Sequence, residues 1–562
     1  MGDMDVWGSR RFRVRGAAAL AGAVALVVAL GSCGLDDKPD SPQAIVEKFT
    51  QLLDDRDAES AAQLTSYPNG AEATLQKLFD GLNPGKPDYQ VAQYIGLDGD
   101  SGMFNLKADW NFGPGKDWTY DLQGTIRKLA IGWRISWEPN VVAPQLDGQR
   151  SIKLVRTDAP PPKVNDNAGN TLMTEQVINV VKLDPAKTPD PVASTNALAD
   201  AIAPVAPLIT GPSLMQQLAA SQGKPVVAVQ LREDDFAILE PRMAPIPGVV
   251  MDKEPRLIVT DRRIFSPLTD AFRKVWQENR DNHAGWGVKL FEADGRPVAQ
   301  LAGQQGPPGP DIASTLDQRL QRAAEDAVVS AGTAASIVAV QPSTGAVVAA
   351  AQNTYASEQG PVAFTGAYPA GGMIELFKQA AAVAKKKAPQ DVSVQDAAEA
   401  AATLGVGIGF KVPGLEQTTG RLPIGGRGVE QVRQGGADPI LASPFGMALA
   451  ASTIARGSVV PPMIEIGRPA TTEAELSPLP DPVLQQLRRM LTDDAAGGPE
   501  LAALRRYAGV TAYAATAGTS GWLLANMGDL AFAIHIDDVD SGDATSRMAA
   551  RMLQALAAPD DK

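Results

Sequence analysis

Few residues of this chain have the types and spacing that catalysis requires. The 562 residues include two histidines, His283 and His535, and a single cysteine, so the sequence offers no cluster of ligands for zinc. We therefore expect neither a metal nor another cofactor. The net charge is −13 and the acidic excess is spread along the chain, which argues against a nucleic-acid partner.

Two short patterns could in principle serve a serine nucleophile. Ser221 and Lys224 have Ser-x-x-Lys spacing, and residues 194–196 read Ser-Thr-Asn. A lysine activates a serine at this spacing when both begin a helix, and Gly223 and Pro225 are incompatible with such a start. We interpret both patterns as chance matches.

Two further serines, Ser443 and Ser520, have no histidine or lysine at local spacing. His535 lies in an apolar run that predicts a strand, where a histidine is more often a packed structural residue than a base. Ser520 is retained only as an alternative, unrecognised nucleophile.

The stretch from Tyr368 to Lys387 reads as a turn followed by a strong helix. It resembles the Tyr-Pro-x-Gly-Ser-x-x-Lys stretch of penicillin-binding transpeptidases, in which the serine accepts the acyl group and the lysine activates it. Aligned on this pattern, Gly372 occupies the serine position and Glu375 the lysine position. A shifted register that makes Lys378 the lysine leaves Glu375 at the serine position. Neither register contains a serine.

Glu375 itself is predicted to be a helix-terminus charge. An acidic residue in the first turn of a helix, with lysines in the last turn, is favoured by the helix macrodipole.

The family's second motif, Ser-x-Asn, has no counterpart. The predicted helix ends near Ala388, and the residues after it lead at once into Gly405–Gly414, which is similar to a later family segment. The resemblance therefore implies a transpeptidase-like domain with a shortened all-helical part, and we expect one wall of the cleft to be open.

The third family motif, Lys-Thr-Gly, should lie between Tyr513 and Trp522. Its positions are best filled by Ala515, Thr516 and Ala517, and residues 518–519, Gly-Thr, form a shifted remnant. Neither register supplies the cation that would position a substrate carboxylate.

The elements that would position these residues resemble the family in chain order. Four segments are similar to the opening helix, the first hairpin, the helix behind the active site and the strand after the third motif: Ser314–Val328, Ala335–Ala351, Leu441–Gly457 and Gly528–Ile536. The resemblance implies a multidomain α+β protein whose C-terminal domain has a central antiparallel sheet flanked by helices, as in the serine β-lactamases.

The amino end predicts an export signal. Arginines at positions 10–15 precede an apolar run from Ala17 to Leu30, which is short for a membrane helix, and Leu-Gly-Ser-Cys ends at Cys33. This segment resembles a bacterial lipobox, which implies lipidation of Cys33 and an anchor on the outer face of the cytoplasmic membrane. An uncleaved anchor or a plain secretory signal is the alternative.

The chain is too long for one hydrophobic core. We predict a lipoprotein signal peptide, a tether, an α+β domain, a pedestal-like domain and a transpeptidase-like domain, over residues 1–33, 34–41, 42–146, 147–303 and 304–558. Helical and then strand patterns in the third segment resemble the cone-shaped N-terminal domain of class B penicillin-binding proteins.

The sequence thus leads to one hypothesis and two alternatives. The first is a membrane-anchored pseudoenzyme of cell-wall biogenesis that binds other wall-building proteins or peptidoglycan, with all three catalytic motifs lost. The second is an active D,D-transpeptidase or carboxypeptidase that uses a different nucleophile. The third is a module that binds a peptidoglycan fragment without covalent chemistry.

Overall fold

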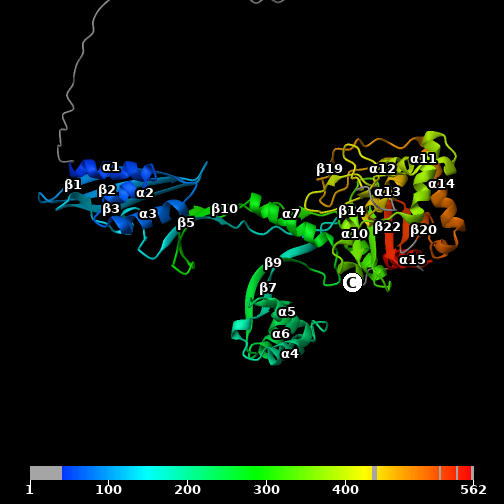
Figure 1. The fold of residues 1–562 in the computed structure, drawn as a ribbon, viewed down its shortest axis with the longest axis horizontal. Coiled ribbons are helices and arrows are strands. Elements are labelled where there is room, and N and C mark those ends of the chain that lie inside the picture. The colour runs from blue at the N-terminus through cyan, green and yellow to red at the C-terminus, as the bar shows by residue number, and fades with distance from the viewer. Residues whose placement is uncertain (1–40, 433–439, 518–519, 539–541, 559–562) are drawn as a thin grey trace, which may run out of the picture. The chain divides into compact units, whose positions relative to one another are not determined.

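The computed structural model describes residues 41–432, 440–517, 520–538 and 542–558 (Figure 1). Contacts divide the chain into two compact units, residues 1–153 with 290–296, and residues 154–289 with 297–562. The predicted signal peptide, Cys33, tether residues 34–40 and residues 518–519 lie outside the described residues. Among the helices that are described, none is both long and apolar enough to cross a membrane.

The first unit contains three helices followed by an antiparallel sheet of order β1-β2-β3-β4. Its elements are α1 Pro42–Asp54, α2 Ala58–Gln63, α3 Pro68–Gly81, β1 Lys86–Gly96, β2 Ser101–Asn111, β3 Asp117–Leu129 and β4 Gly132–Ile135. The helix α1 begins at Pro42 because Ser41 caps it, its hydroxyl accepting the N–H of Ala44 at 3.2 Å. The apolar face of α1 is buried against the sheet, so helices cover one face of the sheet.

The second unit begins with two small sheets and a helical lobe. A three-stranded sheet has the order β11-β10-β5, and a five-stranded sheet has the order β12-β6-β7-β8 with β9 paired to β7. The elements are β5 Ser151–Thr157, β6 Val164–Asn165, β7 Thr171–Leu183, α4 Pro191–Ile202, α5 Gly211–Ala220, β8 Val226–Arg232, α6 Glu233–Met243, β9 Val249–Val259, α7 Leu268–Asn282, β10 Gly285–Phe291, β11 Pro297–Gln304 and β12 Ile312–Ala313.

The rest of the second unit is built on an antiparallel sheet of order β14-β13-β22-β21-β20. Its helices are α8 Gln318–Val328, α9 Thr354–Ser357, α10 Val362–Thr365, α11 Ile374–Lys385, α12 Val394–Thr403, α13 Pro444–Arg456, α14 Asp481–Gly497 and α15 Ala544–Ala557. Its strands are β13 Ala335–Val340, β14 Val347–Gln352, β15 Tyr368–Pro369, β16 Phe410–Lys411, β17 Gly420–Arg421, β18 Leu441–Ala442, β19 Thr471–Thr472, β20 Val510–Ala517, β21 Ser520–Met527 and β22 Leu530–Asp537.

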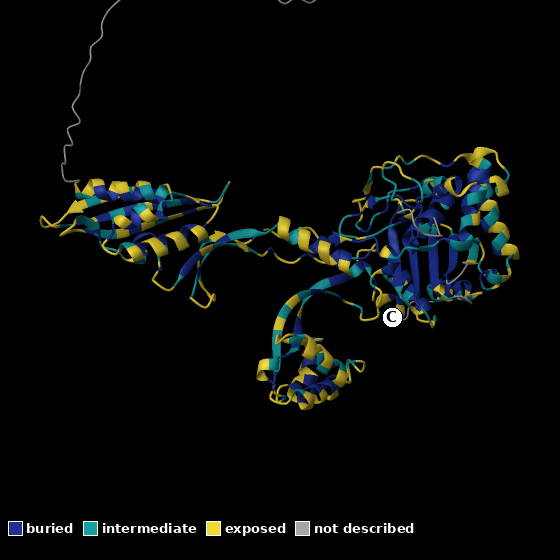
Figure 2. Cartoon of the chain, viewed as in Figure 1, coloured by how far each residue is buried: buried dark blue, intermediate teal, exposed yellow. Residues whose placement is uncertain are grey.

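This central sheet is buried on both faces because its strands are apolar at nearly every position (Figure 2). Alternate residues of β13, such as Val338 and Ile337, belong to two different hydrophobic clusters. The first cluster lies between the sheet and α11, α13 and α14, and the second between the sheet and α8 and α15.

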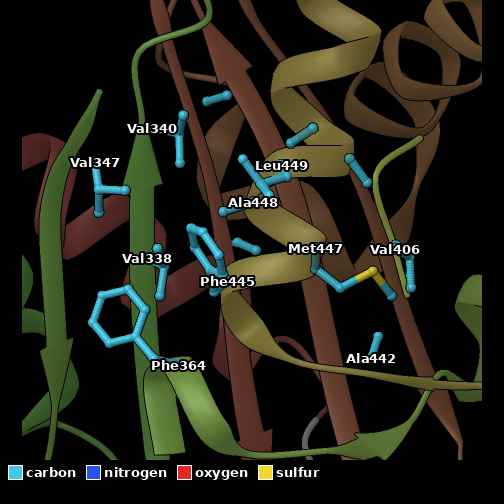
Figure 3. Packing of buried hydrophobic residues seen from close by; sticks show 14 of the residues in the cluster. Val338, Val340, Val347, Phe364, Val406, Ala442, Phe445, Met447, Ala448 and Leu449 are labelled. Atoms are coloured by element: carbon cyan, nitrogen blue, oxygen red, sulfur yellow. The ribbon is translucent and has the colours of Figure 1, made fainter. Parts of the chain in front are cut away.

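Helix α13 lies directly on the sheet and is buried around nearly its whole circumference. Figure 3 shows Phe445, Ala448 and Leu449 of this helix directed toward Val338 and Val340 of β13. The helix begins at Pro444 after the cap Ser443 and ends where Gly457 adopts a φ of +96°.

The structure confirms the elements that the sequence predicted in this half of the chain. The helix, hairpin, second helix and strand expected from family order are present as α8, β13–β14, α13 and β22. The strand β1 and the helices α3 and α12 were not expected. The sequence does contain signals for both helices, because α3 buries Ala71, Leu75 and Leu78 at helical spacing and α12 begins with the capping box of Ser393 and Asp396.

Candidate functional site

The predicted catalytic positions lie where a tight turn meets the edge strand β20. The turn begins with β15, which pairs with β18, and continues as a single 3-10 turn, Gly371–Met373, that leads into α11. Gly371 has a φ of +54°, a conformation that residues with a side chain rarely adopt. The indole N–H of Trp522 donates to the carbonyl of Pro369 at 3.0 Å and so fastens the turn to the sheet.

Gly372 lies directly against Ala515 of β20. A Cβ placed on Gly372 would be 2.8 Å from the Cβ of Ala515 and 3.4 Å from the carbonyl oxygen of Thr516. The first distance is too short for two carbon atoms, and Ala515 cannot move its Cβ without moving the strand. The structure therefore brings together the residues predicted at the first and third motif positions, and leaves no room there for a side chain on Gly372.

Glu375 lies one residue into α11 and is exposed, and its carboxylate accepts the amide N–H of Gln379 at 2.8 Å. Its position in the first helical turn fits the predicted role of a helix-terminus charge. Burial raises the pKa of Tyr513 on β20, and the charges of Asp494 and Glu375 raise it further. Burial likewise raises the pKa of Asp494, which accepts the N–H of Ala514 at 3.0 Å.

The two remaining positions of the third motif lie on the same strand. Thr516 is exposed and pairs with Gly521, and Ala517 ends β20 opposite Ser520. Each of the three positions holds a residue without charge, so β20 offers no cation at the motif positions to bind a substrate carboxylate. The tyrosine and the carboxylates beside this strand give the neighbourhood an acidic character that the motif analysis missed.

His535 is buried in an aromatic cluster next to the turn. Its ring stacks on Tyr368 at a centroid distance of 3.8 Å and lies 4.4 Å from the ring of Trp522. Burial lowers the pKa of His535 to about 3, so the imidazole is neutral at physiological pH. The cluster joins β15, β21 and β22, which supports the packing role predicted for this histidine.

The tertiary structure places Ser520 beside His535, which the sequence did not suggest. The ring Nε2 and the serine hydroxyl are 3.3 Å apart, and both side chains are almost fully buried. A serine next to a neutral histidine has the composition of a nucleophile and its base. Because only 3% of Ser520 is exposed, a substrate carbonyl cannot reach its hydroxyl without an opening of the sheet edge.

The other serines have structural roles. The hydroxyl of Ser443 donates to the carbonyl of Thr418 and accepts the N–H of Gly446 at 2.9 Å, which caps α13. Ser221 ends α5 and donates to the carbonyl of Leu218 at 2.7 Å, and Gly223 has a φ of +82°. Ser194 and Thr195 are buried in α4. Ser443 thus serves as a helix cap, whereas Ser221 ends a helix and Ser194 and Thr195 fill one.

The region expected to lack a helical wall contains α12. Asp396 of this helix accepts Lys387 at 2.8 Å and also pairs with Lys385, which ties α12 to the end of α11. These lysines and the cap Ser393 hold the pKa of Asp396 well below its usual range. The turn and β20 are in contact at Gly372, and the expectation that one wall of the cleft is open stays a prediction.

Hollows of useful size occur elsewhere in the second unit. One of about 510 Å³ surrounds the small sheet β16–β19 and is lined by residues that include Phe410, Lys411, Glu430 and Thr472. A second of about 460 Å³ shares Phe410 and Lys411. Among the described residues, no group of three or more His, Cys, Asp or Glu side chains is arranged to hold a metal ion.

Comparison with known protein families identifies the first domain. Residues 41–150 match the family model of the NTF2-like N-terminal transpeptidase domain, a domain of penicillin-binding-protein-type proteins. The predicted domain of residues 42–146 falls within this match. No curated protein is similar enough in sequence to match the chain. The match shows a transpeptidase-type N-terminal domain in residues 41–150.

A side chain at position 372 should destabilise the second unit. We expect Gly372→Ser to lower the free energy of unfolding by about 1–3 kcal/mol, because an atom forced into a packed contact displaces the turn from β20. Urea unfolding followed by tryptophan fluorescence measures this change. The matched control is Gly332→Ala, at an exposed glycine whose added Cβ would meet nothing within 4 Å. Equal stability of the Gly372→Ser variant and the wild type would contradict the contact.

The imidazole of His535 should stay neutral far into the acidic range. In a His283→Gln variant His535 is the only histidine, so we expect its ring resonances to be constant in NMR spectra between pH 7 and pH 5. The ordinary pKa of 6.5 falls to about 3 on folding, so the unfolded chain binds more protons between these values. This residue's contribution therefore lowers stability as the pH falls from 6.5 to 3. A ring titration near pH 6.5 would refute the assignment.

Proposed function

We propose that this protein is a penicillin-binding-protein-like lipoprotein of peptidoglycan biogenesis whose transpeptidase-like domain has no acyl-transfer activity. In this proposal, Cys33 carries the lipid that holds the protein on the outer face of the cytoplasmic membrane. The domain acts by binding, as a scaffold or regulator of other wall-building proteins, and needs no cofactor.

The contact between Gly372 and Ala515 is the observation that carries this proposal. Acyl transfer needs a nucleophile, and removing the nucleophile of a serine enzyme lowers the rate by about a millionfold. Here the corresponding position has neither a side chain nor the space for one, and β20 has no cation at the predicted motif positions. We infer that a transpeptidase-like domain without this nucleophile and this cation acts by binding other molecules at its surface.

Labelling with a fluorescent penicillin tests the absence of acylation. We expect the full-length protein to give no adduct that survives denaturation, at concentrations that label an active penicillin-binding protein completely. A stoichiometric adduct would overturn the proposal. If such an adduct disappeared in a Ser520→Ala variant, the buried Ser520–His535 pair would be the nucleophile, and the variant should then also fail to release D-alanine from a stem pentapeptide.

A second candidate function is noncovalent binding of a peptidoglycan fragment. The hollow of about 510 Å³ favours it, because Lys411 and Glu430 offer opposite charges and Phe410 an apolar surface to a peptide that carries amino and carboxyl groups.

Calorimetry with a muropeptide distinguishes this function from that of a pure protein scaffold. Binding heat that Lys411→Ala reduces, and that a substitution of the exposed Lys116 in the first unit does not change, would support the binding module. Absence of heat at millimolar muropeptide would exclude it.

A further inference from the structure

One corner of the first unit exposes an unusual group of apolar side chains. Among the described residues of this unit, all exposed large hydrophobic side chains except Tyr67 belong to two neighbouring hairpins. We call this group the sheet tip; its members are Ile95, Leu97, Met103, Leu129 and Ile131, which are between 41% and 69% exposed.

The sheet register places these side chains together. Ile95 pairs with Met103 across β1 and β2, and the N–H of Lys128 donates to the carbonyl of Asp100, which joins the β1–β2 turn to β3. Along β2, residues of one face, such as Phe104 and Leu106, are buried beneath the helices. Met103 belongs to the opposite, open face of the sheet.

The remainder of the open face is polar. Going along β2 away from Met103, the residues of this face are Asn105, Lys107, Asp109 and Asn111. A sheet face that is exposed only to water would have such residues throughout. The apolar residues are therefore confined to one end of the face, and such a confined exposed patch is typical of a surface that binds something.

The chain enters the unit at this same end. The last residue of α1, Asp54, accepts the N–H of Tyr89 near the start of β1 at 2.6 Å, so α1 runs back along β1 and begins near the strand's far end. Figure 1 shows the start of α1 at the end of the domain that carries the β1–β2 turn. Eight residues, 34–41, separate Cys33 from α1, and they span at most about 29 Å when fully extended.

We propose that the sheet tip inserts its apolar side chains into the headgroup region of the membrane that anchors the chain. This inference rests on the membrane anchor of the proposed function and adds a second, noncovalent contact to it. A protein held this close to a bilayer presents the sheet tip to lipid at a high effective concentration, which makes weak insertion sufficient.

The charges around the sheet tip fit this arrangement. Arg127 and Lys128 directly precede Leu129 on β3 and are exposed, and the ammonium group of Lys128 lies 3.9 Å from the carboxylate of Asp100. Long basic side chains at the edge of an inserted surface reach lipid phosphates while their stems stay in the apolar layer. A docking surface for a soluble protein would not need to lie where the chain leaves the membrane.

Fluorescence quenching in vesicles tests the inference. The full-length protein, labelled with an environment-sensitive fluorophore at Ile131→Cys, is reconstituted in phosphatidylglycerol–phosphatidylethanolamine vesicles that contain nitroxide lipid. We expect a blue-shifted emission and quenching several-fold stronger than for a label at Lys116→Cys, in the exposed β2–β3 turn at the other end of the sheet. The wild-type protein, whose single cysteine is Cys33, serves as the control for background labelling. Lipidation of Cys33 blocks its reaction with the fluorophore.

A double variant gives the second measurement. Leu97→Asp with Leu129→Asp changes two exposed side chains, so it should leave the unfolding temperature unchanged and remove the quenching at position 131. Flotation of the protein with the vesicles, together with equally weak quenching at both labels, would overturn the inference and leave the anchor intact. A protein that does not float would refute the anchor, and with it this inference. Quenching that appears only after another protein is added would assign the sheet tip to a protein partner and also overturn it.

Discussion

The close packing of the Gly371–Met373 turn against β20 is the contact on which the character of the second unit depends. In this contact a glycine lies against the Cβ of Ala515 and the backbone of Thr516. The contact excludes a nucleophilic side chain, and it also allows α11 to start close to the sheet and to pack with α14 on its first hydrophobic cluster. The same small residue therefore leaves this position without a nucleophilic side chain and allows the turn to pack closely on β20.

The aromatic cluster next to the turn fixes this arrangement. Trp522 anchors the carbonyl of Pro369, and His535 stacks on Tyr368, so the residues just before the turn are held by two adjacent strands of the sheet. A histidine with a pKa of about 3 carries no charge into this apolar region, and its burial therefore needs no counter-ion. The residues before the turn are thus held by ring contacts and one hydrogen bond, without a charged group.

In the proposal, the two units have different roles. The first unit has one sheet face covered by helices and one left open, and the open face has its apolar residues where the chain arrives from the amino end. The second unit contains the large double-sided core and the hollows near β16. In the proposal, the first unit contacts the membrane and the second unit binds partners.

Much of the fold could be predicted from the sequence. Apolar runs with turn residues between them predicted β13 and β14, and the resemblance to the family predicted α13 and β22. The elements β1, α3 and α12 were not predicted, although α3 has apolar residues at helical spacing and α12 begins with the capping box of Ser393 and Asp396. The ion pairs of Asp396 with Lys385 and Lys387, which join α12 to the end of α11, follow only from the tertiary structure. Among candidate site residues, Glu375 and the motif positions of β20 were found by resemblance to the family. No sequence pattern indicated that Asp494 and Tyr513 would lie beside them.

The sequence by itself determined which chemical groups are missing: residue types alone show that positions 372 and 515–517 have no hydroxyl, amine or thiol besides that of Thr516. Only the tertiary structure decided where these positions lie in space. It placed Gly372 against Ala515 and Ser520 beside His535, residues that are far apart in the chain or on different strands. The physical reason is that side-chain identity is local information, whereas the distance between a turn and a strand results from the packing of the whole core.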